Sequence, residues 1–246
     1  MTRICNCLFS DIIYNSNLTF EEIINYYNVI TPKYKYIPHA KNNIDYFLRQ
    51  RVSFQWPLPL SEEIDGRALD FQSELVEFFD LFPWNSLTPQ WNSKPVIVDV
   101  GTRTFSIAPM LDHFFREKNF EPEIHGIEID AFRRFTNFRS RQDYGLYYAR
   151  KIPHGFYHAM DFLNFNIKAD LICLLHPFVT QEPLLHWGLP LRHFQPQKIF
   201  QHAHTLLNKN AGLLFISCPT EEEKEISKKH AKSAGFEFLE EKTWYP

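Results

Sequence analysis

The chain has 246 residues, 44% of them hydrophobic, which suffices for one large domain, or for one domain with a substantial extension. Its formal net charge of −3 gives no overall attraction to nucleic acid or to anionic membranes, although a local basic face can exist within that total. The four cysteines are not spaced like a secreted disulfide framework, and no stretch approaches the roughly 20 apolar residues of a membrane span. We therefore expect a reduced, cytoplasmic protein.

The N-terminal part is predicted to be a mainly helical extension, or cap, over residues 1–90. Residues 67–82 carry apolar side chains at helical spacing, and a lone helix cannot bury such a stripe. We therefore expect this helix to pack against the rest of the chain through Leu75, Val76 and Phe79. Residues 83–95 are polar and interrupted by proline, which is typical of a connector, so the second domain is predicted to be 91–246.

After the connector, short apolar strands alternate with amphipathic helices. The predicted strands are 96–100, 124–130, 156–160, 169–175 and 213–217, with a last one beginning at 236–239, and the predicted helices are 106–115, 131–142, 198–207 and 220–235. This alternation indicates an α/β fold with a doubly wound, mostly parallel sheet and helices on both faces. We expect the strand 96–100 to be central, with 124–129 and 170–175 beside it. Ligands of such sheets bind beyond the carboxyl ends of the strands.

Acidic residues stand at two of these strand ends. Asp99 and Gly101 close the first strand, and Glu128 closes the second. A carboxylate in the second position can accept hydrogen bonds from both hydroxyls of a ribose, which suits an adenosine-containing ligand. Acids with a purely structural role are equally common at strand ends, so Glu128 by itself does not decide between the two.

Four motifs together resemble those of class I S-adenosylmethionine (SAM) methyltransferases. V-I-V-D-V-G at 96–101 resembles the first glycine-loop motif of that family, and G-I-E-I-D at 126–130 its second-strand motif. A-M-D-F at 159–162 is similar to the acidic corner that contacts adenine, and the run from 199 to 217 to the family's helix–turn–strand signature. The resemblance covers about residues 95–240 in the family's order. It implies a Rossmann-like fold and SAM as the cofactor.

The resemblance also assigns the cofactor-binding residues. Asp99 and Gly101 would line the methionine end of SAM, Glu128 would hold the ribose, and Asp161 with Phe162 would meet the adenine. The sequence departs from the family's pattern directly after Gly101, where it reads G-T-R-T-F-S instead of carrying further glycines.

This departure leaves two roles open for the arginine in the loop. Arg103 and Phe105 stand where small residues would let the backbone approach the ligand. Arg103 either pairs with the SAM carboxylate or fills the pocket.

Other candidate residues carry weaker signals. His176-Pro177-Phe178 follows the fourth strand, where amino-methylating members of the family have an Asn/Asp-Pro-Pro-aromatic tetrad, so His176 is the candidate catalytic base; the alternative is an ordinary loop histidine. The basic stretch 133–151, interleaved with Phe and Tyr, is either a phosphate-contacting surface for nucleic acid or, as is more often the case for such stretches, a solvated helix face. The histidine pairs at 154/158 and 202/204 lack further ligands at metal-site spacing, so we expect no metal.

Three functions are compatible with these features. The first is a SAM-dependent methyltransferase whose acceptor, a small molecule or a macromolecule, is not identified by the sequence. The second is an inactive methyltransferase-like domain that serves as a binding or scaffold module, which the altered glycine loop favours and the retained acids oppose. The third, an NAD-dependent oxidoreductase, is weaker because the first turn lacks the G-x-G-x-x-G cradle for a pyrophosphate.

Overall fold

The computed structural model describes residues 75, 78–135, 139–209 and 211–242. The chain divides into two compact units. The first unit consists of 1–59, 133–140 and 180–194, and the second of 60–132, 141–179 and 195–246. No helix of the described residues is long and apolar enough to cross a membrane. The division at residue 90 that the sequence predicts stays a prediction.

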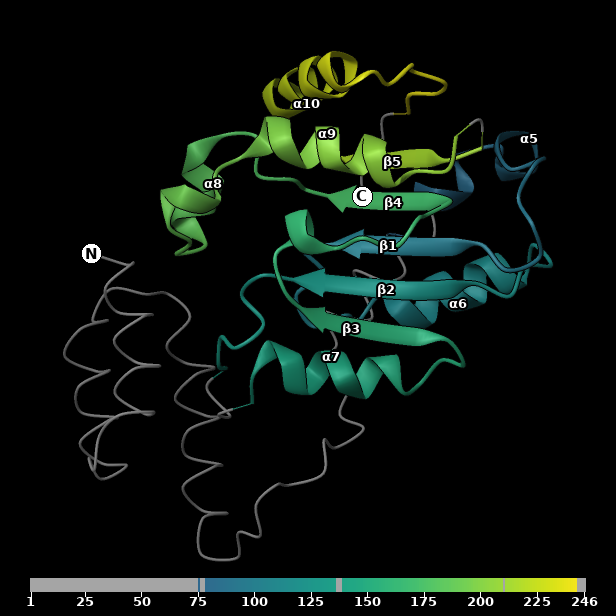
Figure 1. The fold of residues 1–246 in the computed structure, drawn as a ribbon, viewed down its shortest axis with the longest axis horizontal. Helices are drawn as coiled ribbons and strands as arrows, with labels where there is room; N and C mark the ends of the chain where they lie inside the picture. The colour runs from purple at the N-terminus through teal and green to yellow at the C-terminus, as the bar shows by residue number, and fades with distance from the viewer. Residues whose placement is uncertain (1–74, 76–77, 136–138, 210, 243–246) are drawn as a thin grey trace, which may run out of the picture. The chain divides into compact units, whose positions relative to one another are not determined.

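The second unit contains a parallel sheet of five strands (Figure 1). They are β1 (Val96–Val100), β2 (Glu123–Glu128), β3 (Gly155–Ala159), β4 (Leu171–Leu175) and β5 (Leu213–Ser217), in the order β3-β2-β1-β4-β5. β1 pairs with β2 on one side and with β4 on the other, and both pairs are parallel. The predicted Rossmann-like α/β fold, with β1 at its centre, is therefore confirmed.

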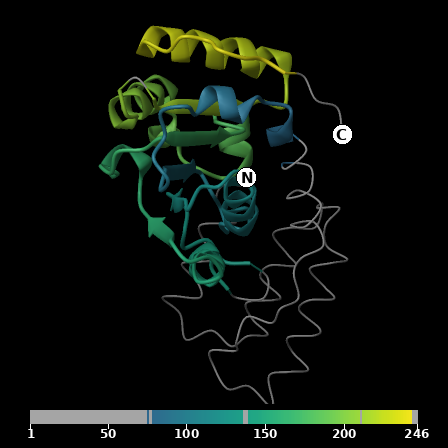
Figure 2. The same ribbon diagram turned by 90° about the vertical axis from the view of Figure 1, so that its right-hand side faces the viewer.

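Helices cover both faces of this sheet. They are α5 (Trp84–Leu87), α6 (Ala108–Arg116), α7 (Arg141–Ala149), α9 (Pro196–Leu206) and α10 (Glu221–Ala234), with a short 3-10 helix η2 (Phe162–Asn164). One buried cluster joins α6 to the sheet, and a second joins α9 to the opposite face. α10 packs beside α9, as Figure 2 shows in a view turned by 90°. Thr220 caps α10 by accepting the Glu223 N–H, and Gly235 ends it with φ +100°, which agrees with the predicted helix at 220–235.

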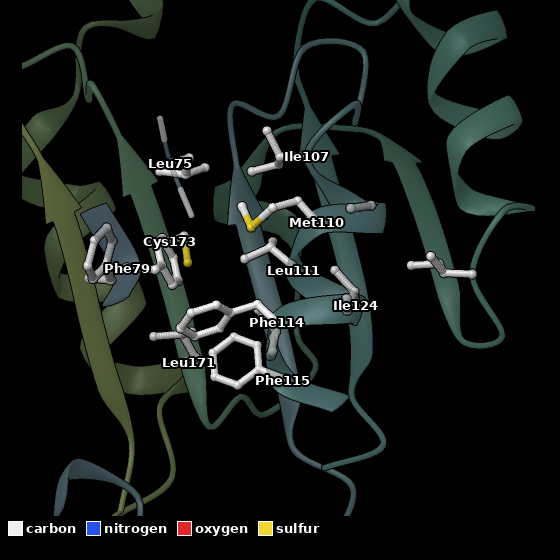
Figure 3. Close-up of a cluster of buried hydrophobic side chains, with 14 of the residues drawn as sticks. Leu75, Phe79, Ile107, Met110, Leu111, Phe114, Phe115, Ile124, Leu171 and Cys173 are labelled. Atoms are coloured by element: carbon white, nitrogen blue, oxygen red, sulfur yellow. The ribbon is translucent and has the colours of Figure 1, made fainter. Parts of the chain in front are cut away.

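The α6 face holds an aromatic core to which the segment before the connector contributes (Figure 3). Leu75 and Phe79 are both buried there, in the same cluster as Phe115 of α6 and Leu171 of β4. The Phe79 ring stacks on Trp84 with ring centroids 5.3 Å apart. The expected packing of the apolar stripe is therefore confirmed for Leu75 and Phe79, while Val76 lies outside the described residues.

The described part of the first unit is small. It contains α8 (Gln181–His186) and the 3-10 helix η3 (Leu191–His193). The Arg133 guanidinium donates a hydrogen bond to the Trp187 carbonyl, and Arg134 forms an antiparallel bridge with Ser140. The described residues between β2 and α7, 129–135 and 139–140, contain no helix.

Two predicted elements are wrong. The helix expected at 131–142 begins instead at Arg141 and runs to Ala149, where it packs on β3. The described residues 131–135 form a turn and an isolated bridge. The strand expected at 236–239 has no secondary structure, because no described strand pairs with it. Strand propensity needs a partner to be expressed.

Candidate functional site

The loop after β1 has an unusual backbone. Gly101, Arg103 and Phe105 have φ angles of +74°, +56° and +60°, in the left-handed region that glycine favours. Arg103 and Phe105 have a Cβ, so this conformation costs each of them roughly 1–2 kcal/mol of conformational energy. The loop therefore keeps an alternating left-handed conformation although only the first of its three left-handed positions is glycine.

Hydrogen bonds from β2 and β3 hold this loop. The Gly101 and Thr102 N–H groups donate to the Ile127 carbonyl at 2.8 and 3.1 Å. The Arg103 N–H donates to Glu128 Oε2 at 2.8 Å, and the Tyr157 hydroxyl donates to the Arg103 carbonyl at 2.9 Å. The backbone on both sides of the Arg103 side chain is thus fixed by contacts distant in sequence.

Phe105 and Gly101 face different surroundings. The Phe105 ring is fully buried and lies over Gly126, where an added Cβ would come within 2.4 Å of the ring. Phe105 therefore fills the core and does not project into solvent beyond β1. Gly101 is exposed, and no described atom lies within 4 Å of the position of its missing Cβ. A ligand can approach the backbone at Gly101.

Glu128 is a buried carboxylate with several donors around it. It is 4% exposed, and besides Arg103 it accepts the Asp130 N–H at 2.7 Å and Arg141 Nη1 at 3.3 Å. A carboxylate offers about four acceptor positions, so about one is left for a ligand. Arg141, part of the basic stretch in the sequence, is buried against this carboxylate and is not on a solvated face.

Asp99 is the second buried acid of the site. It lies in register between Gly126 of β2 and Cys173 of β4, and its Oδ2 has no hydrogen-bond partner among the described residues. Burial raises the pKa of Asp99 to about 7, the negative charge of Glu128 adds to the rise, and the Thr102 side chain opposes it. Asp99 is therefore poised between its neutral and charged forms near neutral pH.

Asp161 and Phe162 follow β3, the neighbour of β2. Asp161 caps η2 by accepting the Leu163 N–H at 2.9 Å through Oδ1. The Phe162 ring is buried in the core cluster of α9 and meets the His202 ring edge-on, with centroids 5.0 Å apart. Asp161 retains an oxygen for a ligand, whereas Phe162 has its main contacts in the core.

His176 follows β4, on the other side of β1 from the acids. It has φ +53°, and its N–H donates to the Ser217 carbonyl at 2.9 Å. The residue is exposed, yet the groups packed around its ring desolvate it and lower its pKa, while the charge of Glu223 opposes the shift. A lowered pKa keeps the imidazole neutral at pH 7, the form that accepts a proton.

The structure thus brings several of the predicted site residues close together. Asp99, Gly101, Arg103 and Glu128 belong to one network at the ends of β1 and β2, while Asp161 and His176 follow the strands on either side of that pair. Sequence reasoning missed Tyr157. It lies opposite Gly126 in the β2–β3 register, and no local pattern in the sequence connects it with the loop 101–105.

Known proteins were compared with the chain in sequence and in structure. No family model matches the sequence, and no curated protein matches it. Among solved structures it is similar to DesVI of Streptomyces venezuelae, with 17% identity over 62% of this chain and 52% of that one, at a TM-score of 0.38. It is also similar to phosphoethanolamine N-methyltransferase 2 of Haemonchus contortus in complex with SAM, with 13% identity over 72% and 43% and a TM-score of 0.39.

A third similar structure is magnesium protoporphyrin IX methyltransferase of Synechocystis with bound SAM, with 12% identity over 92% of this chain and 90% of that one and a TM-score of 0.41. The chain spans about half the length of DesVI and less than half of the Haemonchus contortus protein. The Haemonchus contortus and Synechocystis proteins are both named as methyltransferases, and both structures contain SAM.

Proposed function

We propose that the chain is a SAM-dependent methyltransferase acting on an acceptor still to be identified. The observation that carries this proposal is the loop 101–105, whose alternating left-handed backbone is held by Glu128 and Tyr157 and is open at Gly101. A backbone fixed in this conformation at the carboxyl end of β1 is suited to a ligand that lies against it. Loop strain of this kind clusters at binding sites.

The charges around the loop suit a cationic ligand. SAM carries a sulfonium and an amino group, and a cation next to Asp99 would lower the pKa of this carboxyl and hold it ionised. The free Oδ2 of Asp99 is an acceptor without a partner among the described residues, as such a ligand requires. We therefore assign the methionine end to Asp99 and Gly101, as the motif resemblance implies.

For the adenosine end of SAM, the residues can make fewer contacts than the motif resemblance implies. Three donors already occupy Glu128, so it can accept one ribose hydroxyl, and both only if the Arg103 N–H moves away. Asp161 would accept the adenine amino group with the oxygen that does not cap η2. Phe162 would contribute little contact, because its side chain is buried in the core cluster of α9.

Little acid–base machinery is required of the protein. The SAM sulfonium supplies an activated methyl group, so the chain's own residues need to align donor and acceptor and to exclude water. His176 would accept the proton that an amine or hydroxyl acceptor loses, since its lowered pKa leaves the ring neutral. One observation favours the scaffold function instead: Glu128 is well satisfied by protein donors alone.

Calorimetry with SAM, its demethylated product and NAD tests the proposal. We expect SAM and its product to bind and NAD not to bind. Glu128→Ala should weaken SAM binding at least about tenfold, which corresponds to about 1.4 kcal/mol. Glu123→Ala, at the opposite end of the same strand, is the matched control and should leave SAM affinity unchanged. Melting curves of both variants separate a lost ligand contact from a lost fold.

Arg103→Gly decides between the two roles of that side chain. If Arg103 pairs with the SAM carboxylate, the variant binds SAM about tenfold more weakly; if it fills the pocket, the variant binds more tightly. Absence of SAM and product binding at millimolar ligand in the wild type and in Arg103→Gly would refute the methyltransferase proposal. The scaffold function would then remain.

A further inference from the structure

β5 forms one edge of the sheet and has backbone groups left for another strand. Leu213 donates its N–H to the Asp170 carbonyl of the β4 side, and Ser217 accepts from the His176 N–H. Because backbone groups alternate along a strand, the N–H and C=O of Leu214 and Ile216 are directed at the open edge. None of the described residues hydrogen-bonds to them there. Such an edge is a template for strand addition.

A groove of about 130 Å³ runs along this edge. β5 forms its floor, and apolar side chains from two other segments form its sides. Phe82, with Trp84 and Leu87 of α5, supplies one side, and the tail after α10 supplies Phe236, Phe238 and Leu239. The groove is therefore apolar on both sides of a row of backbone groups to which no described residue hydrogen-bonds.

The tail after α10, residues 236–242, contains a strand-like sequence that pairs with no described strand. Residues 236–239 read F-E-F-L, which predicts the beginning of a strand, yet they have no secondary structure. Phe238 and Leu239 are 53% and 64% exposed. Glu241 anchors the tail to α10 through Lys224 at 3.0 Å and Lys228 at 2.6 Å. A segment inserted beside β5 would cover these apolar side chains and give the tail a neighbour.

The charged residues that line the groove are acidic, which favours a basic occupant. Glu237 and Glu240 are the charged residues among those that line it, and none of the described lining residues is basic. Glu240 also pairs with Lys242 at 3.4 Å, just outside the lining. A second copy of this acidic tail would bring like charges together, which disfavours a symmetric exchange of tails. A basic segment would meet opposite charges.

We propose that the β5 groove binds one extended segment of a partner protein, with apolar residues at alternate positions and lysine or arginine between them. Main-chain hydrogen bonds to Leu214 and Ile216 supply affinity, and the apolar sides of the groove take every second side chain. The proposal concerns an edge of the sheet away from the loop 101–105 and does not depend on methyl transfer.

A pair of synthetic peptides tests the surface on the full chain. The probe is fluorescein-labelled Lys-Val-Arg-Val-Lys-Val-Arg, and the comparison is Glu-Val-Asp-Val-Glu-Val-Asp with the same label. Fluorescence anisotropy should show the basic peptide binding at least about tenfold more tightly than the acidic one. Hydrogen exchange at the Leu214 and Ile216 amides should slow when the basic peptide is bound.

Variants then locate the binding. Ile216→Pro removes an N–H that faces the open edge and leaves the β4 ladder intact, so it should weaken the basic peptide at least about tenfold. Glu237→Lys with Glu240→Lys should reverse the preference between the peptides, and it tests the surface even if the proline variant does not fold. Glu117→Lys with Glu222→Lys changes the net charge equally on exposed residues outside the groove and should leave the preference unchanged.

Three outcomes overturn the proposal. The first is no binding of either peptide at millimolar concentration. The second is equal binding of both peptides, or a preference that the Glu237/Glu240 variant does not change. The third is unchanged exchange at Leu214 and Ile216 with peptide bound, which would place the peptide elsewhere.

Discussion

Asp99 should destabilise the folded protein at neutral pH, and removing its charge should reverse this. The carboxyl is 2% exposed, and burial raises its pKa from 3.8 to about 7. The folded state therefore holds the proton more tightly than the unfolded state does. Stability that is fully present below pH 3.8 is lost as the pH rises toward about 7. Asp99→Asn keeps the shape of the side chain and abolishes this titration.

The size of the effect follows from the two pKa values. The interval from 3.8 to about 7 covers roughly three pH units, and each corresponds to about 1.4 kcal/mol, so the charged form costs about 4 kcal/mol. The near-complete burial of the carboxyl means that little of this cost is screened by solvent. The variant should therefore gain about 4 kcal/mol over the wild type between pH 4 and pH 8.

Guanidinium unfolding of the wild type and of Asp99→Asn at both pH values measures this gain. Asp170→Asn is the matched control, since its carboxylate accepts from the Val96 N–H at 2.9 Å and from Asn208 Nδ2 at 2.7 Å. An amide there turns one acceptor into a donor and should destabilise the protein at both pH values. A difference between Asp99→Asn and wild type that is equal at pH 4 and pH 8 would refute the reasoning.

Two further changes test how the loop after β1 is held. Gly126→Ala places a Cβ 2.4 Å from the Phe105 ring and should lower the free energy of unfolding by about 1–3 kcal/mol; an unchanged denaturation midpoint would contradict this packing. Tyr157→Phe removes the hydrogen bond to the Arg103 carbonyl, costs about 1 kcal/mol and should weaken SAM binding in calorimetry while the circular dichroism spectrum stays the same. SAM affinity equal to that of the wild type would show that Tyr157 does not position the loop.

Local patterns predicted most of the sheet because buried parallel strands are short apolar runs that end at glycine or acidic residues. The strands at 96–100 and 213–217 have the bounds that the sequence predicts. The pattern failed at α7, where Gly145 interrupts the helix sequence. The Tyr157 ring lies within 2.3 Å of the position that a Cβ on Gly145 would take. Glycine is therefore required here by a contact with β3, which the local sequence does not show. The prediction of a strand at 236–239 is wrong because a strand forms only where another strand pairs with it, and the local sequence does not say whether one does.

The site shows the same division. The sequence alone determined that Asp99, Gly101 and Glu128 stand at the ends of neighbouring parallel strands, because strand order along the chain and the right-handed crossover bring them together. Only the tertiary structure decided that Arg103 and Phe105 take left-handed backbones and that Phe105 points into the core. A non-glycine residue seldom has this conformation, and at Arg103 distant groups hold it. Here those groups are a carboxylate at the end of β2 and a hydroxyl on β3, which no local pattern connects to the loop.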